Sequence, residues 1–106
     1  MAKYLVEASY TAEGLRGLMK DKAAGRKAAV EKLLTDMGGK LEGFYFAFGE
    51  ADAYVLVDVP NAVSAAALSM AVSASGVVRS KTISLLTVEE VDQAIAKNVT
   101  YSRPGA

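Results

Sequence analysis

Acidic side chains are the main candidates for chemistry in this chain, because the usual catalytic residue types are missing. None of its 106 residues is cysteine or histidine. Thiolate nucleophiles, imidazole bases, zinc–thiolate sites and Ser-His-Asp or Cys-His catalysis are therefore excluded within the chain. Three acids in or beside predicted strands, Glu7, Asp52 and Asp58, are candidate general bases.

The groups that could assist such a base, or hold a ligand, are two tyrosines and an arginine. Tyr45, Tyr54 and Arg79 could stabilise a developing negative charge, and Leu56 would join them in contacting a ligand. No carboxylate cluster has the spacing of a known cation-binding loop. We therefore expect neither a metal ion nor a cofactor.

Charge and hydropathy limit the partners that the chain could have. Its 12 Lys and Arg residues balance 12 Asp and Glu residues, and its densest basic region is interleaved with acids, so we expect no nucleic-acid binding. No apolar run approaches the roughly 18 residues of a membrane span. The N-terminal segment meets Glu7 too soon for a signal peptide. The expected compartment is the cytoplasm, without membrane contact.

Hydrophobic periodicity predicts four strands and three helices that would position these groups. The expected strands are 3–10, 41–48, 53–59 and 77–86. The expected helices are 12–37, 62–75 and 88–97, the first with a break within 20–26, where the apolar rhythm is lost. Thr11, Asn61 and Thr87 precede them as N-cap residues.

This order predicts an α+β domain of the ferredoxin-like β-α-β-β-α-β type, with a short C-terminal helix added. Its four-stranded antiparallel sheet would carry two helices on one face. We expect residues 1–97 to form this single domain and residues 98–106 to form a polar C-terminal tail. The sheet face without helices, here called the free face, must then be solvated or covered by another subunit.

The predicted hairpin between the second and third strands indicates which side chains lie on each face. A four-residue turn over 49–52 would oppose residues that share a face. The predicted pairs are Phe48–Ala53, Phe46–Val55 and Phe44–Val57, all apolar and therefore directed towards the helices. The free face would carry Leu5, Glu7, Tyr45, Tyr54, Leu56 and Asp58. The side on which Arg79 lies stays open.

Apolar residues at helical spacing predict the packing of the second helix. Its inward side chains would be Val63, Ala66, Ala67, Met70 and Ala74. Apolar and aromatic residues clustered on an exposed sheet face usually mark a contact. We therefore expect a homo-oligomer built through the free face, or a ligand pocket whose floor is that face; a solvated face is the alternative.

Four segments together form a recognisable pattern. They are residues 10–15 (YTAEGL), 38–41 (GGKL), 44–52 (FYFAFGEAD) and 76–82 (GVVRSKT). The pattern resembles the GYD-domain family of small bacterial proteins over about residues 4–92. The resemblance implies a ferredoxin-like fold similar to that of dimeric α/β-barrel proteins, and no particular reaction. Gly49 and Asp52 match the family motif, whereas Ala51 stands where its tyrosine is expected.

Two functions remain open at this point. One is a noncatalytic oligomeric module that binds a small molecule or a partner on the free face. The other is a small cofactor-independent enzyme with a carboxylate base, oxygenase- or isomerase-like by analogy with dimeric α/β-barrel proteins. A carboxylate whose pKa is raised by burial would favour the enzyme. Gly49 and Asp52 also have a structural interpretation, as residues that shape the turn.

Overall fold

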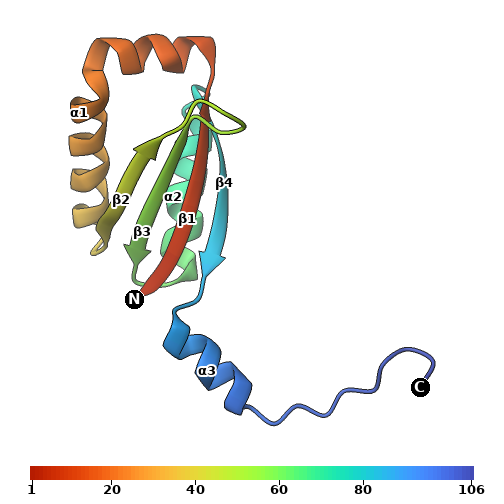
Figure 1. Ribbon diagram of the computed structural model, residues 1–106. Coiled ribbons are helices and arrows are strands. Elements are labelled where there is room, and N and C mark those ends of the chain that lie inside the picture. The colour runs from red at the N-terminus through yellow and green to blue at the C-terminus, as the bar shows by residue number, and fades with distance from the viewer.

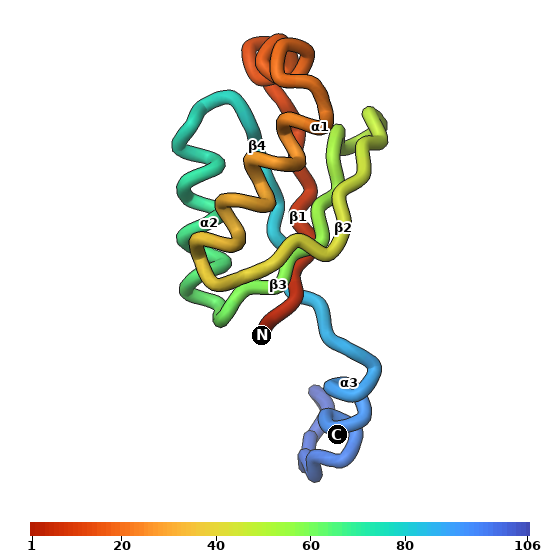
Figure 2. The backbone as a smooth tube through the Cα atoms, turned by 90° about the vertical axis from the view of Figure 1, so that its left-hand side faces the viewer, coloured from red at the N-terminus to blue at the C-terminus, as the bar shows by residue number.

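Four strands and three helices follow one another in the predicted order in a computed structural model that describes residues 1–106 (Figure 1). They are β1 (Ala2–Tyr10), α1 (Ala12–Asp36), β2 (Lys40–Phe46), β3 (Ala53–Val59), α2 (Ala62–Ala74), β4 (Val78–Leu85) and α3 (Val88–Ala96). The strands form one antiparallel sheet in the order β2-β3-β1-β4. Helices α1 and α2 cover one face of it (Figure 2). The predicted ferredoxin-like α+β fold is confirmed.

A small apolar core lies between β3 and the helices. Its buried cluster comprises Leu34, Val55, Val57, Val59, Ala65 and Leu68. The predicted inward face of α2 is wrong, because Val63 and Met70 are exposed and Ala65, Leu68 and the partly buried Val72 contact the core instead. An alanine-rich helix offers little contrast between its faces, so spacing alone does not fix its rotation.

The register of the β2–β3 hairpin differs from the prediction by two residues. Phe46 pairs with Ala53 and Phe44 with Val55, so the connecting loop covers six residues, 47–52. The Ala47 amide closes this loop by donating to the Asp52 carbonyl at 2.9 Å. A shift of two residues leaves the side chains of residues 43–46 on their predicted faces. Only Phe48 leaves the core, into the loop.

Helix α1 bends sharply where the sequence loses its apolar rhythm. Lys22, inside the helix, has φ 68° and ψ 161°, which breaks α1 into two segments and confirms the predicted break. The segment before Lys22 crosses one end of the sheet, and the segment after it runs along the helix-covered face (Figure 1).

The start of α1 is held against the start of β4 by one carbonyl group. The Val77 carbonyl accepts hydrogen bonds from the Thr11 amide at 3.0 Å and from Thr11 Oγ1 at 3.3 Å. Gly14, one turn later, lies so close that a Cβ there would be 2.1 Å from the same oxygen. A glycine at this position therefore permits the contact between α1 and β4.

The C-terminal part of the chain extends away from the sheet. Helix α3 has no buried residue, and the residues after it form neither helix nor strand (Figure 1). The radius of gyration is 16.9 Å, against about 13 Å for a compact domain of this length. None of the three helices has the length and apolar character needed to cross a bilayer.

Replacing Gly14 with alanine tests the α1–β4 contact. We expect Gly14→Ala to lower the free energy of unfolding by about 1–3 kcal/mol, because the new methyl group collides with a backbone oxygen. Gly17→Ala is the matched control, since no atom lies within 4 Å of its added Cβ, and it should stabilise the helix by up to about 1 kcal/mol. Urea denaturation of both variants measures the difference. Equal effects would contradict the proposed role of Gly14.

Candidate functional site

The structure resolves which strand residues share the free face. Glu7 pairs with Tyr54 on one side and with Lys81 on the other, and Tyr54 pairs with Tyr45. Directly opposed residues lie on the same face, so these four form one row across all four strands. Tyr45 is 68% exposed. The row therefore places two phenol rings, one carboxylate and one ammonium group on the free face.

A second row and a shallow recess complete the free face. Leu56, Leu5 and Ile83 are opposed on β3, β1 and β4, and Arg79 pairs with Ser9, which places Arg79 on this face as well. A recess of about 240 Å³ is lined by Glu7, Ser9, Glu50, Ala51, Arg79, Ser80 and Lys81. Of the predicted site residues, it brings together only Glu7 and Arg79.

Asp58 is engaged in an ion-pair network at the other end of the face. Lys3 Nζ lies 3.0 Å from both carboxylate oxygens of Asp58 and 3.2 Å from Glu42 Oε1, and Lys40 approaches Glu42 at 3.5 Å. Burial raises the pKa of Asp58, but hydrogen bonding with Glu42 and Lys3 outweighs it and holds the pKa below its usual value. Asp58 therefore stays ionised and paired.

Asp52 has a structural partner outside its own turn. Its Oδ2 accepts a hydrogen bond from the Tyr10 amide at 2.8 Å, and its backbone amide donates to the Ala8 carbonyl at 2.8 Å. The side chain thus takes the place of a strand partner where β3 has not yet begun. Gly49 does not adopt a positive φ; the left-handed residue of the loop is Phe48, with φ 54°.

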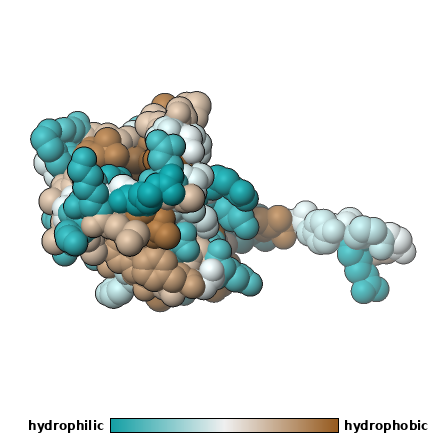
Figure 3. Space-filling view, turned by 90° about the horizontal axis from the view of Figure 1, so that it is seen from above, coloured by the Kyte–Doolittle hydropathy of each residue, from teal (hydrophilic) through white to brown (hydrophobic).

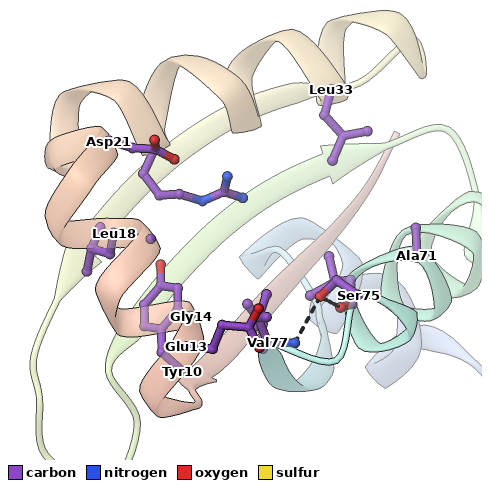
Figure 4. Close-up of a pocket in the computed structure, with 13 residues that line it drawn as sticks. Tyr10, Glu13, Gly14, Leu18, Asp21, Leu33, Ala71, Ser75 and Val77 are labelled. Atoms are coloured by element: carbon purple, nitrogen blue, oxygen red, sulfur yellow. Dashed lines mark hydrogen bonds between the residues drawn. The ribbon is translucent and has the colours of Figure 1, made fainter.

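The largest cleft lies on the opposite side of the sheet, where the sequence predicted only core. It has a volume of about 460 Å³ and opens between the two segments of α1, the end of α2 and the start of β4 (Figure 4). Its polar lining comprises Tyr10, Glu13, Asp21, Arg26 and Ser75. Leu18, Leu33 and Val72 belong to its apolar wall.

A small apolar chamber of about 80 Å³ continues this cleft towards the sheet. The two cavities share Tyr10, Arg26, Leu33, Val72 and Val78 as lining residues. The chamber's other lining residues are all apolar: Val6, Ala8, Val30, Phe44, Ala53, Val55, Val57 and Leu68. The combined space has a polar entrance and an apolar interior, the usual character of a small-molecule site.

Tyr10 lies where the entrance meets the interior. Burial raises the pKa of its phenol, and Asp52 acts in the same direction, whereas Arg26 opposes both. The phenol therefore stays protonated at neutral pH and can donate a hydrogen bond. The bend at Lys22 was the only sequence signal for this cleft, because it separates Asp21 from Arg26 and directs two segments of one helix along different walls.

The sheet order and helix placement define the class, an α+β domain of the ferredoxin-like kind. The family model of the GYD domain matches residues 4–95, and the chain belongs to this family. Searches among curated proteins and among solved structures gave no match.

Nowhere do three or more Asp and Glu side chains gather in a way that could hold a metal ion.

The low pKa of Asp58 gives protein stability a defined pH dependence. A carboxyl group that loses its proton more readily in the folded state contributes stability above its unfolded pKa of about 4, and the contribution disappears as pH falls through the lower folded value. We expect Asp58→Asn to lower the free energy of unfolding at pH 7 by about 1–3 kcal/mol. The difference from the natural protein should shrink below about pH 4.

Denaturant titrations between pH 7 and pH 2.5 measure this difference. Asp36→Asn is the control, because Asp36 is exposed and pairs only with Lys32 one helical turn away, at 3.1 Å. Such a pair contributes about 0.3–0.5 kcal/mol. A difference between the natural protein and Asp58→Asn that stays constant down to pH 2.5 would contradict the assignment.

Proposed function

We propose that the chain is a noncatalytic module that binds a small molecule in the cleft between its helices and its sheet. The observation that carries this proposal is the continuity of the polar entrance with the apolar chamber. The volume of about 460 Å³ is within the usual range of roughly 300–1,000 Å³ for ligand pockets. The free face, where binding was first expected, offers a smaller and mainly polar recess.

The lining indicates the chemical class of the ligand. Arg26 is the one basic residue among the lining residues of both cavities, and it would bind a carboxylate or carbonyl oxygen. The Tyr10 hydroxyl would donate a second hydrogen bond. Glu13 and Asp21 beside the entrance disfavour a multiply charged anion. The ligand class is therefore a compact apolar or aromatic molecule with one carbonyl or carboxylate group.

The enzyme alternative has less support from the candidate bases. Catalysis by a carboxylate near pH 7 needs a raised pKa, whereas that of Asp58 is lowered by its partners. Asp52 is occupied by the Tyr10 amide. Glu7 lies opposite Lys81 across the β1–β4 ladder, on the half-exposed free face.

We further propose that copies of the chain associate through the free face. Only 12 of the 106 residues are buried in the single chain, so much apolar surface is left uncovered. The free face contributes the row of Leu5, Leu56 and Ile83 together with exposed Tyr45. Face-to-face packing of two sheets would bury these side chains. This interface and the helix-side cleft use different residues.

An anionic fluorescent probe tests the cleft. Anilinonaphthalene sulfonate combines an apolar body with one anionic group, so we expect it to bind and brighten in the natural protein. Arg26→Leu should weaken binding about tenfold, equivalent to about 1.4 kcal/mol, while Lys27→Leu, outside the lining, should not. Ala71→Trp should block the entrance, because Ala71 lines it. Ala67→Trp, on the same helix outside the lining, is its control.

Probe binding that is equal in Arg26→Leu and Lys27→Leu would contradict the proposal. Equal binding in Ala71→Trp and Ala67→Trp would do so as well. Native mass spectrometry of protein purified from its own host then reports any retained natural ligand. We expect its mass to disappear in Ala71→Trp and to remain in Ala67→Trp.

A further inference from the structure

Helix α3 presents an apolar face that nothing in its own chain covers. Val88, Val91 and Ile95 recur at the spacing of one helix face, and Val88 and Ile95 are each 75% exposed. A capping box between Thr87 and Glu90 defines the start of the helix. Nine residues are fewer than the roughly 12–15 at which isolated helices become marginally stable in water. The helix therefore needs a packing partner.

A complementary apolar recess lies at the opposite end of the sheet. It has a volume of about 430 Å³ and is lined by Leu18, Met19, Lys22, Ala23, Phe46 and Phe48. Met19 is 66% and Phe48 is 59% exposed. Figure 3, which views this end of the molecule, shows hydrophobic side chains at the surface beside hydrophilic ones.

The backbone conformation of Phe48 is a separate argument that a partner covers this recess. A bulky aromatic residue rarely adopts a positive φ, because the conformation is strained. Phe48 packs on Phe46, with ring centroids 5.8 Å apart, yet most of its ring stays in solvent. Burial within its own chain therefore does little to offset the strain, whereas burial against a partner would.

The occupant of the recess cannot be α3 of the same chain. Strand β4 ends at Leu85, and helix α3 begins just beyond that end (Figure 1). Strand β2 ends at Phe46 at the opposite end of the sheet, and the recess lies there. Eight residues of β4 span about 26 Å. The two residues between β4 and α3 cannot bridge that length in the reverse direction.

Charge supports a second copy as the partner. Helix α3 contains Glu89, Glu90 and Asp92 and no basic residue. The recess contains Lys22, and the same part of α1 carries exposed Arg16 and Lys20, so its three basic residues outnumber its two acids, Glu13 and Asp21. An acidic helix with an apolar face thus matches an apolar recess with basic neighbours.

We propose that α3 of one copy packs into this recess of a second copy, and that the exchange is reciprocal. A two-fold pair that reverses the strand direction brings the α3 end of each copy to the recess end of the other. Helix α3 lies beside the sheet end on the side away from α2 (Figure 2), so this pairing also turns the free faces towards each other. The inference rests on the proposed self-association and is independent of ligand binding in the cleft.

Complementation between two full-length variants tests the exchange. The arm variant Val91→Gln/Ile95→Gln and the recess variant Met19→Gln/Phe48→Asn change only exposed side chains, and asparagine tolerates the positive φ of Phe48. We expect the natural protein to sediment as a dimer at micromolar concentration. Each variant alone should dissociate at least tenfold more readily. Their equimolar mixture should recover dimer, because one intact helix–recess pair forms in the mixed species.

Two controls separate this contact from the free-face interface. Val63→Gln removes an equally exposed apolar side chain from α2 and should leave the dimer unchanged. Ile83→Asp on the free face should weaken the dimer, and mixing with the recess variant should not restore it. An arm variant that stays as dimeric as the natural protein, or a mixture that recovers nothing, would overturn the exchange. Unchanged association of Ile83→Asp would instead count against the free-face interface alone.

Discussion

The contact of the Val77 carbonyl with the start of α1 fixes the arrangement on which the candidate site depends. The group accepts two hydrogen bonds from Thr11 and touches Gly14, so the first turn of α1 cannot separate from the start of β4. The following segment must then cross the sheet end before it bends at Lys22. That path leaves space between helices and sheet, and the cleft is this space.

Side-chain parity explains which features the sequence could predict. The alternation along each strand places Tyr45, Tyr54 and Leu56 on the free face whether the loop has four or six residues, so the faces were predictable and the register was not. The rotation of α2 was not predictable, because its faces differ little in polarity. The cleft was missed because its walls come from segments that only the bend at Lys22 brings opposite each other.

The polar residues divide into those whose side chains stabilise the fold through hydrogen bonds and those whose side chains line the cleft. Asp52 and Asp58, although attractive as acids in sequence, satisfy backbone and lysine donors. The sequence did not predict Tyr10 and Arg26 as site residues, because a tyrosine at the end of a strand and an arginine in a helix are common on protein surfaces. Chemical type alone could not sort these groups, since hydrogen-bond partners and cavities exist only in three dimensions.

The irregularity in β2 affects which changes in chain length the sheet can accept. Leu41 pairs with Val57 and Gly43 with Leu56, so Glu42 is an extra residue between two successive pairs. Loss of Glu42 would leave a regular ladder in which all the remaining side chains of β2 keep their present faces. Loss of Tyr45, further along the strand, would instead move a neighbouring phenylalanine, Phe44 or Phe46, to the free face. Related chains that are one residue shorter in this strand can therefore keep the same two faces by lacking the bulge.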